Sequence, residues 1–532
     1  HPPTPLLSMS ASPPPAKNQM KTVFWFGIAA LFLSNRKALL HAAPMTSIGA
    51  IMIGIACMFP MYLWCAGRVK GMPIFPFFTL TYLWTFCLPL LSENPNVLKY
   101  PPTAHLYASF TTVTFLLSGT LIWWQFVRSP KPVQSAFLAL KTKPAENFFF
   151  WTLGAALLFN MYFLARWFSV PESLFTLVRG IVIGLSTLGI FVLAYRCGGG
   201  YLSKFKSRLL FFLLAGIILT SAATLILKTA LTLFLMSVIA YVIGGRKLPV
   251  LPLVIGLICL LPLHYGKHPM RHKYWEGPPK LVQPWEYPAW FQEWASYSQQ
   301  TLSEKPQRWD PPKEKKESFV ERSSVIHMLM MAQDKIPRLY PTMNGATYGI
   351  IPQLMLPRFL NPNKIRSHEG THMLNVHVKR QTYQQTFKTV IAWGLLPEAY
   401  ANFGFIGAFI VGGSLGAFYG FVTMQGVEAP TFSFRTLFCI LVISFALAST
   451  EWTAGVYAAT LQQSSMPLIG MRLVFMRRFR KMRQKKVVPA PVGLSQQDMA
   501  WLRSDPELLQ QLIDELEQRS TPPIPQQLKP QT

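Results

Sequence analysis

The chain has 532 residues, a formal net charge of +28, and a composition that is 51% hydrophobic and 14% charged. Its apolar residues fall in long blocks, whereas a soluble domain of this size would alternate them with polar residues, so a purely soluble protein is excluded. Lys and Arg collect on the cytoplasmic loops of membrane proteins. The basic charge therefore does not indicate a nucleic-acid partner, and we expect none.

The N-terminal part begins with a Pro-rich stretch and continues with apolar blocks. Residues 1–20 lack the small-residue cleavage site of a signal peptide, so we expect a disordered tail. Each later block has about the 17–25 residues that a helix needs to cross a bilayer. The candidate spans lie near 22–34, 46–66, 72–91, 106–127, 147–166, 173–195, 209–227, 229–243, 248–265, 400–424, 434–450 and 454–475.

These spans predict an all-α, polytopic integral membrane protein with about 11–12 transmembrane helices. We expect an N-terminal helix bundle over 21–265, a large external loop domain over 266–399 and further transmembrane helices over 400–475. A basic tail over 476–532 completes the sequence. The first apolar block is short, so it either crosses the membrane or lies at its surface.

Basic residues indicate the orientation, because they mark the cytoplasmic side. They place the 266–399 segment outside the cytoplasm, and Arg36 and Lys37 alone do not fit. The basic stretches that fall on the cytoplasmic side are Arg68/Lys70, Arg128 to Lys143, Arg196 to Arg208, Arg246/Lys247 and Arg472 to Lys486.

The 266–399 segment is too long and too aromatic for a passive connection, so we expect it to be folded. Its first part, Trp275 to Trp309, mixes tryptophans with prolines and charges, which suits sugar stacking or anchoring at the membrane interface. Its second part, Ser318 to Asp334, predicts a helix that carries Arg322 and His327.

The basic tail is predicted to contain an amphipathic helix over 504–519. Ser504 caps it, Pro506 suits its first turn, and Glu507 completes a capping box. The leucines that follow form one apolar stripe, which packs on this protein, on the membrane surface or on a partner protein.

Several enzyme motifs are absent or out of place. The chain has no Gly-x-x-x-x-Gly-Lys-Ser/Thr phosphate loop and no Asp-x-Asp pair to hold a metal-bound nucleotide sugar. The stretch from Gly412 to Gly416 matches the Gly-x-Ser-x-Gly string of hydrolases. It lies inside an apolar span, so close helix packing explains it better.

One zinc-protease pattern is complete as a string. His368-Glu-Gly-Thr-His372 has the His-Glu-x-x-His spacing that places two zinc ligands on one face of a helix. Gly370 and the prolines upstream favour a loop instead. Glu398 would have to serve as a distant third ligand, so we expect a chance match and no bound metal.

Cations gather in the second half of the 266–399 segment. Arginine holds phosphate groups bidentately, and a neighbouring His or Glu can accept the proton of an attacking hydroxyl. Contact with lipid headgroups or surface ion pairs would be the plainer role. Lys228 interrupts an apolar run elsewhere, either at a tight turn or beside this group. The group consists of Arg322, His327, Lys335, Arg338, Arg358, Lys364, Arg366, His368 and His372, with Glu398 as a further candidate base.

Two linked stretches resemble the signature of the Wzy-like polysaccharide polymerases, in the O-antigen polymerase and ligase superfamily. Asn344 to Gly349 and Pro357 to Lys364 are similar to Gly-x-Thr-Tyr…Pro-Arg-x-x-x-Pro-x-Lys. Pro397 to Gly407 is similar to Glu-x-Tyr-x-Asn-Phe-Gly-x-x-Gly. Lys228-Thr229 resembles the family's Ser-Arg/Lys-Thr step, with Lys where Arg is commoner.

The resemblance implies a metal-independent, cofactor-free glycosyltransferase with a GT-C-like fold in the bacterial inner membrane. It would join polyprenyl-diphosphate-linked oligosaccharide repeat units at the outer, periplasmic face, with membrane lipid and the flippase and chain-length regulator of its pathway as further partners. The implied catalytic residues are His327, His368 and Glu398. The implied diphosphate- or glycan-binding residues are Lys228, Arg322, Arg338, Arg358, Lys364, Arg366, Tyr348, Tyr400 and Asn402.

Four other functions stay open. An O-antigen ligase-like enzyme would share the fold and the donor. A transporter of lipid-linked glycans would usually place carboxylates at mid-membrane, whereas the glutamates here lie at block ends. A zinc protease would use the His368 to His372 string, and a non-catalytic scaffold would use the tail helix near Leu512.

Overall fold

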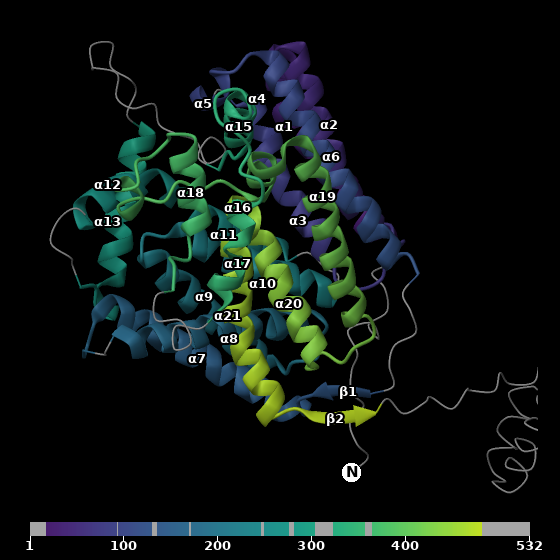
Figure 1. The fold of residues 1–532 in the computed structure, drawn as a ribbon. Coiled ribbons are helices and arrows are strands. Elements are labelled where there is room, and N and C mark those ends of the chain that lie inside the picture. The colour runs from purple at the N-terminus through teal and green to yellow at the C-terminus, as the bar shows by residue number, and fades with distance from the viewer. Residues whose placement is uncertain are drawn as a thin grey trace, which may run out of the picture. The chain divides into compact units, whose positions relative to one another are not determined.

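The protein is described by a computed structural model that places residues 17–92, 94–129, 136–169, 172–245, 249–275, 281–303, 323–356 and 364–480. Helices dominate these residues, together with one two-stranded sheet (Figure 1). The predicted all-α fold is confirmed. The predicted tail helix over 504–519 and the Pro-rich start lie outside the described residues.

Eleven helices of the described residues are long and apolar enough to cross a membrane, which confirms a multi-pass membrane protein. The first apolar block, left open above, is among them. The eleven are Met20–His41 within α1 (Lys17–His41), α2 (Pro44–Cys65), α3 (Ile74–Tyr82) with its continuation η1 (Leu83–Cys87) and α4 (Leu88–Leu91), α6 (Pro102–Val127), α7 (Thr142–Ala165), Val178–Gly198 within α8 (Glu172–Gly198), α9 (Lys204–Ala223), α10 (Leu227–Gly245), α11 (Val250–Leu260) with α12 (Leu263–Trp275), α19 (Leu395–Gly426) and α20 (Phe434–Ala448) together with the 3-10 turn that follows it.

The last predicted span, 454–475, is the exception. It forms helix α21 (Ala454–Val474), but polar residues such as Gln462 and Gln463 leave it less apolar than the eleven others. It packs against α8 and α20. Polar side chains on such a helix find partners on neighbouring helices more readily than in lipid.

Helices α6 and α19 approach each other closely through glycines. A Cβ at Gly412 would collide with the backbone of Phe115, and one at Gly416 with the backbone of Gly119. Small residues let two helix backbones come this near inside a membrane. The packing role predicted for the Gly412 to Gly416 string is confirmed.

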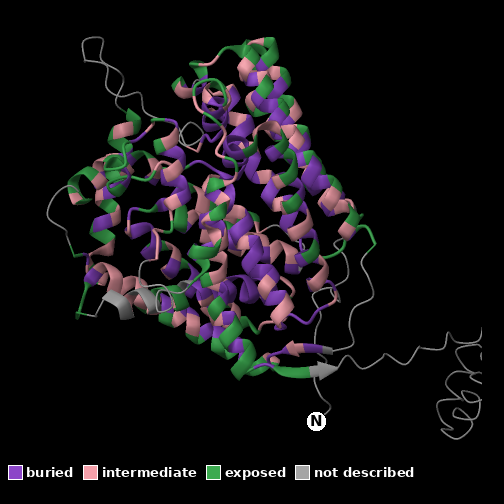
Figure 2. Cartoon of the chain, in the orientation of Figure 1, coloured by how far each residue is buried: buried purple, intermediate pink, exposed green. Residues whose placement is uncertain are grey.

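Aromatic rings fill the space between α3, α6 and α19. Phe75 stacks on Trp123 at 5.4 Å between ring centroids, and Phe78 lies 5.2 Å from Tyr419, all four of them buried. Figure 2 shows the buried residues concentrated where helices face one another. Large apolar side chains on the outer surfaces, such as the 81% exposed Trp151, suit contact with lipid.

A buried ion cluster ties the basic ends of three helices together. Glu146 of α7 lies 2.6 Å from Arg196 of α8 and 2.8 Å from Lys206 of α9. The guanidinium of Arg196, whose side chain is 5% exposed, also lies over the rings of Tyr201 and Phe432. Burying a carboxylate is tolerable when cations pair with it this closely.

The two-stranded sheet lies at the same basic end. Strand β1 (Ala136–Ala139) pairs with β2 (Arg477–Arg480), and Ala139 forms a further bridge with Ser433. The Ser433 hydroxyl in turn accepts a hydrogen bond from the Thr436 backbone and caps α20. The sheet thus joins the start of α7 to the end of α21.

The 266–399 segment begins with a helix hairpin. Helix α12 continues to Trp275, beyond the predicted end of its span, and packs against α13 (Tyr287–Ser303). The indole N–H of Trp294 donates to the Leu263 carbonyl at 2.8 Å, and Trp290 is buried beside it. These two tryptophans hold the hairpin, whereas Trp275 and Trp285 are exposed.

Short helices make up most of what the structure describes of the rest of this segment. Part of the helix predicted over Ser318 to Asp334 is seen as α15 (Ile326–Lys335), and the stretch up to Arg322 lies outside the described residues. The short elements are η2 (Pro284–Glu286), α15 (Ile326–Lys335), α16 (Ala346–Gly349), α17 (Ile351–Met355), α18 (Glu369–His377) and η3 (Gln385–Phe387), with α5 (Pro95–Leu98) and η4 (Ser449–Glu451) nearby in other loops.

Candidate functional site

The start of α19 carries one of the two linked stretches and is bent at a glycine. Gly404 has φ +62° and ψ −150°, a conformation essentially restricted to glycine. This kink interrupts the helical hydrogen-bond pattern. The backbone N–H groups of Met343 and Asn344 donate instead to the carbonyls of Ala401 and Asn402, both at 3.1 Å.

The other linked stretch docks on this kink. Asn344 and Gly345, both with positive φ, turn the chain into the short helix α16. Thr347 of α16 donates to Glu398 Oε1 at 2.7 Å, and its hydroxyl accepts from the Asn402 amide at 2.9 Å. Residues about fifty positions apart in the sequence therefore form one hydrogen-bonded unit.

A third element completes this unit. The second oxygen of Glu398 accepts from the backbone N–H of Ala454, the first residue of α21, at 2.6 Å. Unpaired N–H groups at a helix start favour a carboxylate. We call Thr347, Glu398, Asn402 and Ala454 the carboxylate cluster.

Glu398 is completely buried, and neutral donors occupy both of its carboxylate oxygens. No ion pair within the described part of the chain involves it. A carboxylate enclosed in this way orients its neighbours.

The turn before α21 links this cluster to distant parts of the chain. The hydroxyls of Thr453 and Thr371, the latter on α18, lie 3.1 Å apart. Glu451 of η4 pairs with Lys228 at 2.6 Å, across a gap of more than two hundred residues. Lys228 is therefore brought near the cluster, and its partner is a carboxylate.

The His-Glu-x-x-His string is helical, which corrects the loop expected from Gly370 and the prolines. Gly370 is buried against Thr347 and Ile350, and this packing overrides the low helix propensity of glycine. Helix α18 starts at Glu369, with His368 at its N-cap. Among the described residues, no three His, Cys, Asp or Glu side chains come together to hold a metal ion.

Two imidazoles of this string face the same side of α18. The ring centroids of His368 and His372 are 6.4 Å apart. Burial lowers the pKa of both, and Arg366 lowers that of His372 further. Neither ring nitrogen of His372 has a hydrogen-bond partner among the described residues. The lowered pKa favours the neutral form of both rings.

Arg366 lies beside these rings. It donates to Glu369 at 3.0 Å and lies over the ring of Phe387, 4.2 Å from its centroid. Its Nη2 atom is buried and has no partner within the described part of the chain. Both N–H bonds of Nη2 therefore lack an acceptor among the described residues.

His327 belongs to a second group, on α15. Its Nδ1 lies 3.1 Å from the Ser324 hydroxyl. Burial lowers the pKa of His327 to about 4, and the positive charges of Arg380 and Lys99 act in the same direction. His327 is thus a neutral base at pH 7 in a cationic environment.

The remaining candidate residues lie outside these two groups of histidines. Tyr348 stacks on Phe403, and burial together with Glu398 raises the pKa of its buried phenol. The hydroxyl of Tyr400 lies 3.3 Å from that of Tyr107. Arg338 is an exposed partner of Asp334. Of the other candidates, Lys364 is half-buried, and Arg322 and Arg358 lie outside the described residues.

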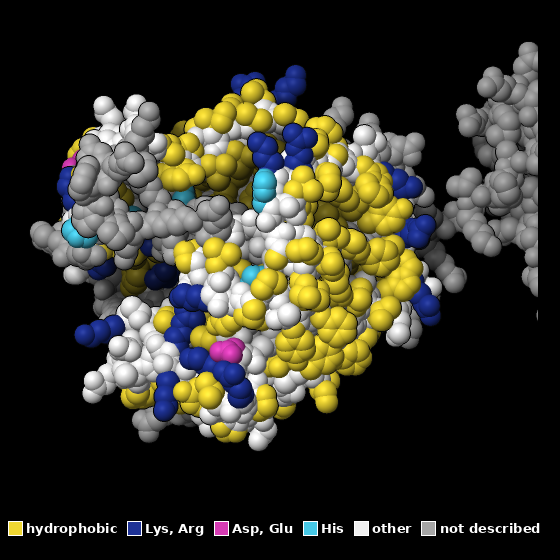
Figure 3. Space-filling view, turned by 90° about the horizontal axis from the view of Figure 1, so that it is seen from above, with side chains coloured by type: hydrophobic (Ala, Val, Ile, Leu, Met, Phe, Trp, Pro, Cys, Tyr) yellow, Lys and Arg dark blue, Asp and Glu magenta, His cyan; other side chains and the backbone are white. Residues whose placement is uncertain are grey.

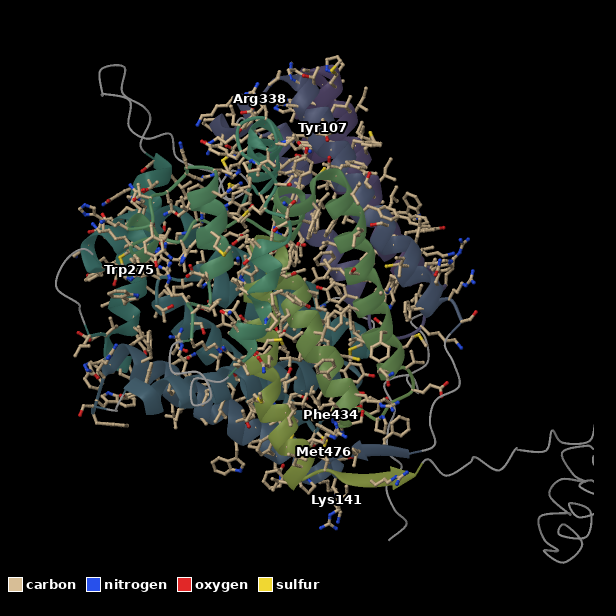
Figure 4. The ribbon with its side chains drawn as sticks, viewed as in Figure 1. Tyr107, Lys141, Trp275, Arg338, Phe434 and Met476 are labelled. Carbon is tan, nitrogen blue, oxygen red and sulfur yellow. The ribbon has the colours of Figure 1, made fainter. Side chains whose placement is uncertain are left out.

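Two figures show where these groups lie. In Figure 4, Arg338 and Tyr107 are at one end of the helices, opposite to Lys141, Phe434 and Met476. Figure 3 looks onto the first of these ends and shows Lys and Arg side chains gathered beside a hollow. Of the candidate cations, Arg338 thus lies at the end of the molecule that carries α15.

Some residues of the site were missed by the sequence. Thr347 lies inside the Asn344 to Gly349 stretch, but nothing in the sequence marks it as a hydrogen-bond partner of Glu398. Ala454 contributes only a backbone N–H group, and Arg380 approaches His327 from a distant loop, so neither carries a signal in the sequence.

A scan against protein-family models finds no match to this chain, and neither do searches of the curated proteins and of the solved structures.

Proposed function

We propose that this protein is a metal-independent membrane glycosyltransferase that joins polyprenyl-diphosphate-linked oligosaccharide repeat units at the outer face of a bacterial inner membrane. The observation that carries the proposal is the bond set of Thr347, Glu398 and Asn402. It joins the two stretches that resemble the polymerase family into one structural unit. If the two resemblances arose by chance, the two stretches would have no reason to contact each other.

The chemistry of the surrounding groups suits this reaction. An acceptor hydroxyl attacks the anomeric carbon of the donor glycan, the bond from that carbon to the diphosphate breaks, and polyprenyl diphosphate leaves. Arg366 and neighbouring cations would stabilise the charge that develops on the diphosphate. A neutral imidazole, from His327, His368 or His372, would take the proton of the attacking hydroxyl.

Glu398 has a positioning role in this proposal. It holds α16, the kinked start of α19 and the start of α21 together. Because α18 touches the same turn through Thr371 and Thr453, the position of its imidazoles depends on this junction.

The decisive experiment deletes the gene in the source organism and analyses its lipid-linked glycans. We expect single repeat units to accumulate on the polyprenyl carrier. Finished chains stranded on the carrier would indicate a ligase instead, and unchanged glycans would refute both enzymes.

A complementation series sharpens this test. Arg366→Gln should fail to restore polymer, whereas Lys273→Gln, which removes an equal charge from an exposed ion pair, should restore it. Equal activity of both variants would show that Arg366 does not bind the diphosphate.

A further inference from the structure

A pocket of about 230 Å³ opens at the basic ends of α7 and α21, far from the carboxylate cluster along α21. Its walls are largely apolar. Leu140 and Met471 form its buried floor, and the exposed rings of Phe148 and Phe475 flank it. In Figure 4 the labelled Lys141 marks this end of the helices.

Two cations stand at the rim of this pocket. Lys141 immediately precedes α7, and Arg477 is the first residue of β2, just beyond α21. Pairing of β1 with β2 fixes these two chain segments relative to each other. Within the described ranges, neither cation takes part in an ion pair.

The combination of walls and rim identifies one class of ligand. Phe475 is 64% exposed and follows the exposed Leu473 and Val474, so apolar surface and basic charge meet at this point. Such a boundary is typical of the membrane interface. Basic pockets between transmembrane helices bind anionic lipid headgroups. A soluble anion would gain nothing from the apolar walls.

We propose that this pocket binds an anionic glycerophospholipid. Its phosphate lies between Lys141 and Arg477, and the first part of an acyl chain lies against Phe148 and Phe475. The site is independent of the glycosyl transfer proposed above, so either proposal can fail without the other.

The test uses the full chain, purified into nanodiscs of phosphatidylcholine with a minor fraction of phosphatidylglycerol. Native mass spectrometry measures which lipids remain bound. We expect the wild-type chain to retain phosphatidylglycerol selectively. The double variant Lys141→Gln/Arg477→Gln should bind it about tenfold to thirtyfold more weakly, because each cation near the membrane surface contributes to anion binding.

A matched control removes the same charge elsewhere on the basic side. Lys204 and Arg208 are exposed at the start of α9, outside the pocket. Lys204→Gln/Arg208→Gln should leave selective retention unchanged. An equal loss in both double variants would show only general attraction of charge and overturn the proposal, as would wild-type retention by Lys141→Gln/Arg477→Gln.

Two further measurements separate a lipid from a free phosphate. Phe148→Ser keeps both cations and should still weaken phosphatidylglycerol retention, because it removes an acyl contact. Inorganic phosphate in excess should not displace the lipid. Displacement by phosphate, with no effect of Phe148→Ser, would overturn the lipid assignment. A cooperative thermal unfolding transition, measured in nanodiscs of pure phosphatidylcholine, shows that each variant is folded.

Discussion

Glu146 and Glu398 are both buried carboxylates near helix ends, but their surroundings differ. Glu146 contacts two cations, Arg196 and Lys206, at 2.6 and 2.8 Å. Glu398 contacts a hydroxyl and a backbone N–H group, and no cation within the described part of the chain. One carboxylate belongs to a closed ion cluster, the other to a junction of neutral donors.

The difference indicates what each end of the molecule does. A carboxylate that is neutralised by two cations links three helices, and its loss leaves both cations without a partner. A junction of neutral hydrogen bonds can orient side chains without adding charge beside an anionic substrate. We therefore expect substitutions at Glu146 to affect stability and substitutions around Glu398 to affect activity.

The largest effect on stability is expected from Glu146→Ala. Arg196 would remain buried without its carboxylate, at a cost of about 3–5 kcal/mol in unfolding free energy. Denaturant unfolding in detergent would measure it. As a control, Arg196→Met added to Glu146→Ala should recover much of the loss, because it removes the unpaired charge. If Glu146→Ala left the unfolding free energy unchanged, Glu146 would not stabilise the packing of these helices.

Gly404→Ala should come next. The backbone conformation at this kink is essentially restricted to glycine, so alanine costs about 1–3 kcal/mol and straightens the start of α19. Polymer formation should fall along with the melting temperature. Gly154→Ala, in open space within α7, should lower neither, because alanine favours the helix more than glycine does. Full activity of Gly404→Ala would show that the kink is not needed.

Thr347→Val should destabilise less but still impair function. It keeps the shape of the side chain and removes hydrogen bonds to Glu398 and Asn402, for a cost of about 1–2 kcal/mol. Glycan analysis should show that the amount of polymer falls by more than the amount of folded protein does. Thr347→Ser, which keeps the hydroxyl, should behave like the wild type. A Val variant as active as the Ser variant would remove the cluster from the mechanism.

The smallest effect on stability is expected from Lys228→Met. Its side chain is 56% exposed, so losing the pair with Glu451 costs at most about 1 kcal/mol. Comparing Lys228→Met with Glu451→Gln in the polymer assay tells whether the cation has a second role. A cation that only pairs with Glu451 gives equal results, whereas one that also binds diphosphate gives a lower activity for Lys228→Met.

Most of the fold could be predicted from the sequence, because uninterrupted apolar blocks of span length permit little besides membrane helices. The span predicted over 454–475 forms helix α21, although Gln462 and Gln463 keep it out of the eleven helices that are apolar enough by composition alone. The loop predicted around Gly370 was wrong, since burial against Thr347 outweighs the propensity of a single glycine.

The candidate site could be predicted only in part. The motifs pointed to Glu398 and Asn402, and the structure places both in one cluster. They did not indicate that Ala454 supplies a hydrogen bond or that Lys228 has Glu451 as its partner. Such contacts depend on which helices become neighbours in the fold. The residue types around Ala454 or Lys228 in the sequence do not indicate which helices those are.

The modest apolarity of α21 affects how the protein is synthesised. Moving this segment alone from the insertion machinery into lipid is less favourable than for the eleven other helices. Its partners α8 and α20 are made before it. Helix α21 therefore joins the bundle by packing on protein that is already inserted. Because α21 begins at Ala454, the nascent chain can close the junction around Glu398 only after all the transmembrane helices before α21 have been inserted.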